Sequence, residues 1–230
     1  MAVMFSAAGV VAGLAGLVGA WWWQRRAQRD LAARRAAIFD DCRDLLQGAD
    51  LAHPGSDYPL LRGTHHGRRV MLQPLLDHVG YRKVPSLWLV ITVDEPLPLG
   101  GSVDILFRPD NIEFYSGIDG LPERIHLPSA WPEHHMARVG PVGWQPPLAA
   151  LHAALGETGE SVDLKELVVT PRGVRMVVRI GGVERAHYMV LRAMLPLVER
   201  IERGWLTHWL DTVVAVADAV REPVIEGGGR

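Results

Sequence analysis

The pattern of apolar and polar positions is sharpest at the N-terminus. No charged side chain occurs from Met1 to Trp23, and five of the next twelve residues are arginine. As a helix, this 23-residue run would rise about 33 Å, enough to cross a hydrocarbon core of about 30 Å. Tryptophan prefers the membrane–water interface, and arginine prefers its cytoplasmic side. We predict a transmembrane anchor over residues 1–23, with interface residues Trp21, Trp22, Trp23, Arg25 and Arg26.

A cleaved signal peptide is the competing interpretation of this segment. It requires basic residues before the apolar run and small residues before the cleavage site. Val18-Gly19-Ala20 resembles such a site, but no Lys or Arg precedes it and three tryptophans follow. The uncleaved anchor is therefore favoured. Because the arginines lie after the run, we expect an outward-facing N-terminus and a cytosolic C-terminal domain at the inner membrane of a bacterial cell.

Small residues recur along the predicted anchor. Gly9 and Gly13 form a Gly-x-x-x-Gly spacing, which allows two helices to approach closely in lipid. A homodimer through Gly9 and Gly13 is one expectation from this spacing. The alternative is that the glycines only fill a single-pass anchor.

After the anchor, helical spacing of apolar residues continues. It predicts a juxtamembrane stalk helix over residues 24–47, with Gly48 as its C-cap and a loop to Tyr58. Cys42 is the single cysteine, which excludes an intrachain disulfide. We expect Cys42 to pack as a small buried residue of this helix, because no activating motif surrounds it.

The middle of the chain has β-type patterning. Short apolar runs separated by turn residues predict antiparallel hairpins. The expected pairs and strands are 60–64 with 70–72 around His65-His66-Gly67, 85–93, 103–107 with 112–115, and 166–170 with 174–180. The Pro- and Gly-rich residues 117–147 should wrap the domain without forming elements, and residues 146–155 should form a short helix.

The C-terminal part has the clearest helical period. Apolar residues advance by three or four from 191 to 220, interrupted at Pro196 and Gly204, which predicts two helices or one kinked helix. Trp88, Trp205 and Trp209 should fill the core. The predicted fold class is α+β: a single N-terminal transmembrane helix, then a cytosolic domain (48–225) of antiparallel β-hairpins covered by C-terminal helices, and a disordered tail (226–230).

Charge divides along the chain. Residues 1–35 carry a net charge of +4, whereas the remainder has 19 basic and 25 acidic residues, a net charge of −6. An acidic domain of this kind argues against a nucleic-acid partner. The basic stalk instead suits the anionic inner leaflet of a lipid bilayer.

One basic cluster is a candidate site. Arg68, Arg69, Arg82 and Lys83 flank two predicted strand starts and would bind a phosphate or an anionic headgroup if they converge. The alternative is that they form ordinary surface ion pairs.

Motifs for metal binding and catalysis are absent from the sequence. Adjacent histidines on a strand point to opposite faces, and there is no H-E-x-x-H, so no metal site and no cofactor are predicted. No phosphate loop, dinucleotide fingerprint or nucleophile elbow is present. We therefore predict no catalytic residues, while an enzyme assembled from distant residues stays open.

These observations favour a membrane-anchored, non-enzymatic interaction or assembly module with an unknown protein partner. A membrane-tethered sensor or binding domain for an anionic small molecule or lipid headgroup is the alternative. A membrane-tethered hydrolase is the third possibility.

Overall fold

A computed structural model describes residues 7–53, 58–76, 86–109, 113, 115–182 and 200–221. Its helices are α1 (Ala7–Ala36), α2 (Leu148–Leu155) and α4 (Arg203–Ala219), and its short 3₁₀ turns are η1 (Ala37–Phe39), η2 (Arg43–Leu45), η3 (Ile118–Gly120) and η4 (Gly156–Glu160). Its strands are β1 (Gln47–Ala52), β2 (Leu60–His65), β3 (Arg68–Leu76), β4 (Ser86–Asp94), β5 (Ser102–Phe107), β6 (Glu123–Ile125), β7 (His135–Gly140), β8 (Leu164–Thr170) and β9 (Gly173–Gly182).

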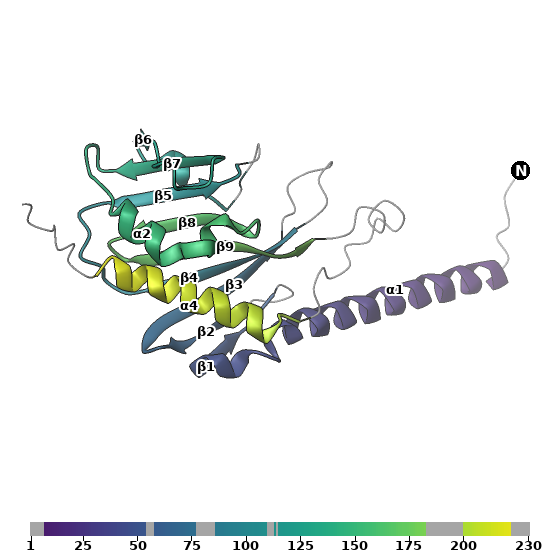
Figure 1. Ribbon diagram of the computed structural model, residues 1–230. Helices are drawn as coiled ribbons and strands as arrows, with labels where there is room; N and C mark the ends of the chain where they lie inside the picture. Colours follow the sequence, from purple (N-terminus) through teal and green to yellow (C-terminus); the bar gives the residue numbers. More distant parts are fainter. Residues whose placement is uncertain are drawn as a thin grey trace, which may run out of the picture.

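Within these described residues the strands form one antiparallel sheet, in the order β1-β2-β3-β4-β9-β8-β5-β7-β6. Helices α2 and α4 cover one face of the sheet, and α1 projects away from the domain (Figure 1). The predicted α+β class with antiparallel hairpins and a covering C-terminal helix is confirmed.

The core lies between the sheet and the two covering helices. Alternate residues of β4 face the helices and are fully buried, which follows from the two-residue period of a strand. On α4, residues at helical spacing meet them. The main contributors are Leu87, Leu89, Ile91 and Val93 from β4, with Leu206, Trp209, Leu210, Val213 and Ala217 from α4.

Several predicted elements are confirmed. Strands β2 and β3 pair through a two-residue turn in which His66 and Gly67 both have positive φ, 48° and 79°. This is the turn geometry that matches the twist of a hairpin. The predicted strand at 85–93, the hairpin of β8 and β9 and the short helix α2 are also present.

The predicted stalk helix over 24–47 is too long. The α-helix ends at Ala36, and the chain then turns through η1 and η2 so that Ile38, Phe39 and Cys42 become fully buried. Burying these side chains in the core outweighs continuing the helix into solvent. The predicted loop from Ala49 to Tyr58 begins as a strand instead, because β1 extends to Ala52 and pairs with β2, with an irregular register between Gln47 and Asp50; residues 54–57 of that loop lie outside the described residues.

The pairing of the central strands also differs from the prediction. Strand β5 pairs with β7 and β8 rather than with a strand at 112–115, of which residues 112 and 114 lie outside the described residues. Residues 117–147, predicted to lack regular elements, contain β6 and β7. Long-range strand pairing is decided by the tertiary fold and leaves no local turn signal.

The three tryptophans predicted in the core have different surroundings. Trp209 is 2% exposed and belongs to the core. Trp205 is half-buried at its edge, within 6.0 Å of the Trp209 ring. Trp88 is buried on the opposite face of the sheet, 5.5 Å from the Tyr115 ring. The prediction is thus confirmed for Trp209 and, in the smaller cluster on the opposite face, for Trp88, whereas Trp205 only borders the core.

Gly9 and Gly13 both lie in α1. Among the described residues, none of the helices combines the length and apolar character needed to cross a membrane. Residues 191–199 of the predicted C-terminal helical segment and the predicted tail (226–230) lie outside the described residues.

Candidate functional site

The face of the sheet away from α2 and α4, here called the open face, carries a row of polar side chains. In each pair of neighbouring strands, one residue of this row lies directly opposite the next. Across the sheet the row runs in the order Arg62 (β2), Met71 (β3), Thr92 (β4), Arg175 (β9), Val168 (β8) and Asp104 (β5). The opposite face at these strands is apolar. The open face is therefore the part of the sheet on which polar chemistry gathers.

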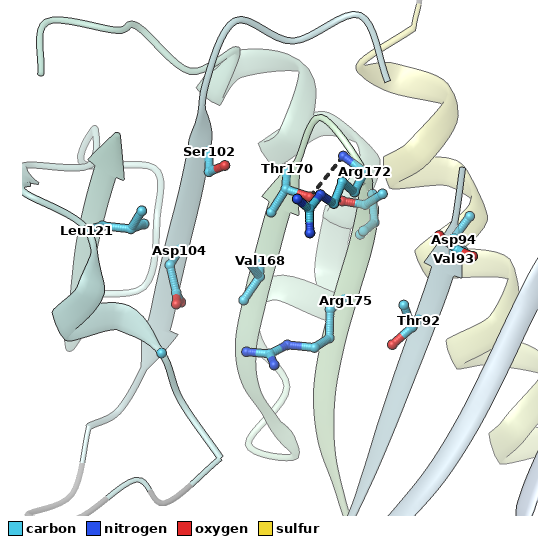
Figure 2. A pocket seen from close by; sticks show the side chains of 13 residues that line it. Thr92, Val93, Asp94, Ser102, Asp104, Leu121, Val168, Thr170, Arg172 and Arg175 are labelled. Carbon is cyan, nitrogen blue, oxygen red and sulfur yellow. Dashed lines mark hydrogen bonds between the residues drawn. The ribbon is translucent and has the colours of Figure 1, made fainter. Parts of the chain in front are cut away.

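A cavity of about 370 Å³ lies over this row, between β4, β9, β8 and β5 (Figure 2). Side chains from the four strands and the segment at Gly117 and Leu121 surround it. Its polar lining consists of Thr92, Asp94, Ser102, Asp104, Thr170, Arg172 and Arg175.

Asp104 is the most unusual group in the cavity. It lies in the middle of β5 and is 2% exposed, and its Oδ1 has no hydrogen-bond partner among the described residues. Burial raises the pKa of Asp104 to about 8, and the nearby Glu166 carboxylate adds to the rise while Arg175 opposes it. Asp104 is therefore mainly protonated at neutral pH and can donate a hydrogen bond from its carboxyl group.

Glu166 and Arg175 form an ion pair beside Asp104. The guanidinium of Arg175 donates to Glu166 Oε2 at 2.8 Å, and the Glu166 side chain is fully buried. Burial raises the pKa of Glu166, against the opposing effect of Arg175. The three side chains come from adjacent strands, so the sheet holds them rigidly. A perturbed carboxyl that lines a cavity, with a second one buried beside it, marks a functional-site candidate.

A second hollow, of about 670 Å³, adjoins this cavity and shares Thr92 and Asp94 with it. Arg62 and Arg69 line it. Arg69 is 74% exposed and 3.9 Å from the equally exposed Asp94, an arrangement worth little in water. Together the two hollows extend from β2 to β5 along the open face.

The predicted anion-binding residues do not all meet on this face. Arg69 does, but Arg68, its neighbour in β3, points to the helix side, since successive residues of a strand alternate. There Arg68 contacts the carboxylates of Glu95 and Asp218 and is 13% exposed. Arg82 and Lys83 lie outside the described residues.

Asp104 and Glu166 were missed because nothing in their spacing marks a site. Each is a single acid within an apolar strand sequence, VDILF and LKELVV. A lone acid in such a run is the available signal, since a buried carboxyl costs free energy unless it is paired or neutral.

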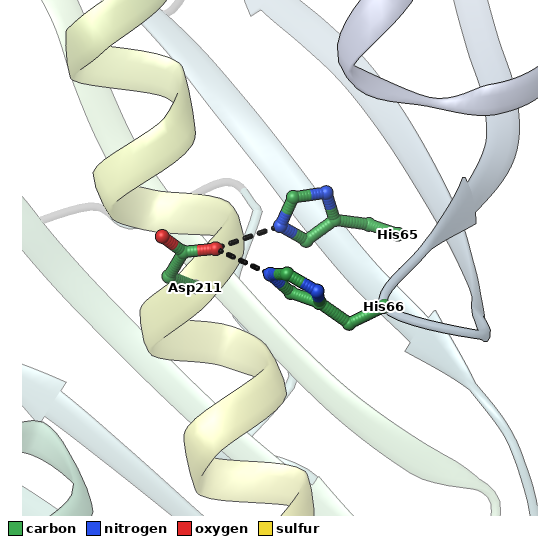
Figure 3. Close-up of side chains that lie close together, drawn as sticks. All are labelled: His65, His66 and Asp211. Atoms are coloured by element: carbon green, nitrogen blue, oxygen red, sulfur yellow. Dashed lines mark hydrogen bonds and ion pairs between the residues drawn. The ribbon is translucent and has the colours of Figure 1, made fainter.

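Metal-ligating side chains gather on the other side of the molecule. His65 at the end of β2, His66 in the β2–β3 turn and Asp211 on α4 place their ligand atoms within 4.8 Å of one another (Figure 3). The expectation that adjacent histidines diverge is wrong here, because the turn conformation of His66 rotates its ring toward the same carboxylate. The contact of both histidines with Asp211 was not predicted from the sequence.

The predicted membrane-interface residues lie on the part of α1 that leaves the domain. The side chains of Trp21, Trp22 and Trp23 are 54%, 58% and 72% exposed. The guanidinium of Arg25 lies 4.2 Å from the Trp21 ring, and that of Arg26 lies 5.6 Å from the Trp22 ring. These residues thus form one exposed cluster of aromatic and basic side chains on the helix, here called the Trp–Arg cluster.

No protein-family model matches the sequence, and no curated protein matches it either. Among solved structures, the mycobacterial trehalose monomycolate transport factor A, TtfA, is similar with a TM-score of 0.36 and 12% sequence identity. The similarity covers 70% of this chain and 71% of that one. A TM-score of this size assigns neither a fold family nor a function.

Proposed function

We propose that this chain is a non-enzymatic interaction module, anchored by residues 1–23 as a single pass, which presents its α+β domain at the cytosolic face of a membrane. The observation that carries the proposal is the exposure of α1. Leu14, Leu17 and Val18 are 58%, 69% and 62% exposed on a helix segment without charge. Contiguous apolar surface of this kind is unfavourable in water and marks a membrane or protein contact.

The Trp–Arg cluster favours a membrane, over a soluble protein partner, as the surface that α1 contacts. Tryptophan rings with an adjacent guanidinium suit the boundary between hydrocarbon and headgroups. The arginines follow the apolar run, which favours a cytosolic domain.

The junction between α1 and the domain supports a presenting role. Ile201 N donates to Ile38 O at 2.9 Å, so the segment after α1 is bonded to the chain just before α4. Ion pairs of 2.6 Å link Arg200 to Asp41 and Arg203 to Asp44. These contacts hold the segment that directly follows α1 against the start of α4, so α1 leaves the domain from a fixed point.

Membrane fractionation of the full-length chain tests the anchor. The chain should stay in the membrane pellet after an alkaline carbonate wash, and the double variant Leu17→Lys/Val18→Lys should be released, because lysine is costly inside a span, up to about 2.5–3.5 kcal/mol per residue at its centre. Val142→Lys is the matched control, since Val142 is 72% exposed on the domain. Wild type in the soluble fraction, or equal retention of the double variant, would contradict the anchor.

Reporter fusions test the orientation. A C-terminal fluorescent protein should be bright and a C-terminal periplasmic phosphatase inactive. Changing Arg25, Arg26 and Arg29 to Glu should weaken or invert this result. Strong phosphatase activity of the wild-type fusion would place the domain on the other side.

The open face supports a second candidate function, binding of an anionic small molecule or lipid headgroup. Arg62 and Arg69 supply charge at one hollow, and Asp104 supplies a neutral carboxyl donor at the other. The double variant Arg62→Gln/Arg69→Gln should lose binding to free inorganic phosphate in calorimetry, or to vesicles containing anionic lipid in flotation. Arg179→Gln, on β9, is the control. Equal binding by wild type and the double variant in both assays would refute this function.

A further inference from the structure

The β2–β3 turn meets helix α4 at three side chains that share one centre. His65 Nε2 lies 2.7 Å from Asp211 Oδ1, and His66 Nε2 lies 3.2 Å from the same oxygen (Figure 3). The two imidazole rings are 4.2 Å apart. Two imidazole nitrogens and a carboxylate oxygen therefore converge from segments that are 145 residues apart in the chain.

Both ring nitrogens of His65 face oxygen acceptors. Its Nδ1 faces the carbonyl oxygen of Leu45 at 3.3 Å, and its Nε2 faces Asp211 Oδ1. Both facing atoms are acceptors, whereas a neutral imidazole carries a single N–H. If Nδ1 donates to Leu45, the lone pair of Nε2 points toward the carboxylate, and a cation bound by both atoms would satisfy them.

We propose that His65, His66 and Asp211 bind a divalent first-row transition metal ion of the zinc type. Bonds from zinc to nitrogen or oxygen are about 2.0–2.2 Å, so neighbouring ligand atoms of a tetrahedral site lie about 3.3 Å apart. The contacts of 2.7 and 3.2 Å approach this spacing, and small side-chain rotations supply the rest. Imidazole and carboxylate ligands select zinc-like ions over magnesium, which prefers an all-oxygen set.

One of the three ligands is buried and two are exposed, which suits a site that can exchange its metal ion with solvent. The side chain of His65 is 9% exposed and is oriented by the Leu45 carbonyl, the usual outer contact of a metal-binding histidine. His66 and Asp211 are 65% and 51% exposed, which leaves room for water or a further ligand on the ion.

The position of the site indicates what the ion would connect. Leu45 ends η2, in the segment that leads from α1 into the domain, and Asp211 is in the middle of α4. A metal ion here would link the β2–β3 turn to α4 and, through His65 and Leu45, to the segment that follows α1. It would add a crosslink within the folded domain and stabilise it by mass action.

Zinc titration of the chelator-treated, full-length chain in mild detergent tests the proposal. Wild type should bind one Zn²⁺ per chain in calorimetry and show a higher melting temperature with Zn²⁺ but not with Mg²⁺. His66→Gln and Asp211→Asn should each weaken zinc binding by more than about tenfold, since even outer contacts are worth about 10–100-fold. Both changes are at exposed positions, and circular dichroism of the zinc-free variants checks that they fold.

The matched control is His53→Gln, which removes an exposed histidine outside the cluster and should leave zinc binding unchanged. No zinc binding by wild type would overturn the proposal. So would equal binding by wild type and both cluster variants, or a loss in His53→Gln as large as in His66→Gln.

Discussion

Asp104→Asn is the change that tests the candidate site most directly. The substitution keeps the shape of the side chain and removes its ability to ionise. In the wild type, burial and the neighbouring Glu166 raise the pKa of Asp104 from 3.8 to about 8. Unfolding releases the group to water, where it ionises near the lower value.

The sign of the effect follows from proton binding. Between pH 3.8 and about 8 the folded chain retains a proton on Asp104 that the unfolded chain has lost. The contribution of Asp104 to stability is therefore full below pH 3.8, falls as the pH rises and is lost once the pH passes about 8. The slope is at most about 1.4 kcal/mol per pH unit, so by pH 7 the loss approaches an upper limit of about 4 kcal/mol.

Urea unfolding of the full-length chain, followed by tryptophan fluorescence from pH 4 to pH 8, measures this slope. The free energy of unfolding of the wild type should fall more steeply with pH than that of Asp104→Asn, in which the raised pKa of Glu166 still contributes. The buried amide has its own cost, but that cost does not change with pH and cancels when the two pH values are compared. Between pH 4 and pH 7, the free energy of unfolding of Asp104→Asn should thus rise by several kcal/mol relative to that of the wild type, within the limit above.

Asp94→Asn is the matched control. Asp94 lines the same cavity, but its side chain is 72% exposed and solvent screens its charge. This variant should follow the pH dependence of the wild type. Parallel curves for wild type and Asp104→Asn would refute the assignment of a neutral, buried carboxyl at the open face.

Three further predictions concern the packing of the domain. Trp209→Ala should lower the free energy of unfolding by about 3–5 kcal/mol in urea titrations, and Trp205→Ala by less, because only Trp209 is fully enclosed. Gly173→Ala should destabilise by at least about 2 kcal/mol, since Gly173 has a φ of 148° and a Cβ there would overlap the carbonyl of Val93; Gly117→Ala, with open space around it, is the control and should change stability little. Cys42 should resist thiol reagents until the chain unfolds, because burial raises the pKa of its thiol to about 11, and rapid labelling in native buffer would contradict this.

Local patterns in the sequence determined a good part of this fold. The period of α4 places a stripe of apolar residues on one face, and β4 is an almost continuous apolar run. Both must be buried whatever their partners. The turns at His66-Gly67 and at Pro171-Arg172-Gly173 depend on residues a few positions apart, so the hairpins they join were predictable. The end of the long helix was not, because what stops it at Ala36 is a core to which Ile38 and Phe39 belong.

The sites were decided by tertiary structure. Asp104, Glu166 and Arg175 meet because β5, β8 and β9 are adjacent in the sheet, an order that no local signal encodes. Arg68 and Arg69 are neighbours in sequence, yet the alternation of β3 sends one to the carboxylates beside α4 and the other to the open face. Periodicity and turn chemistry act over a few residues and can be read from the sequence, whereas the pKa of a buried carboxyl and the convergence of His65, His66 and Asp211 depend on which distant segments pack together.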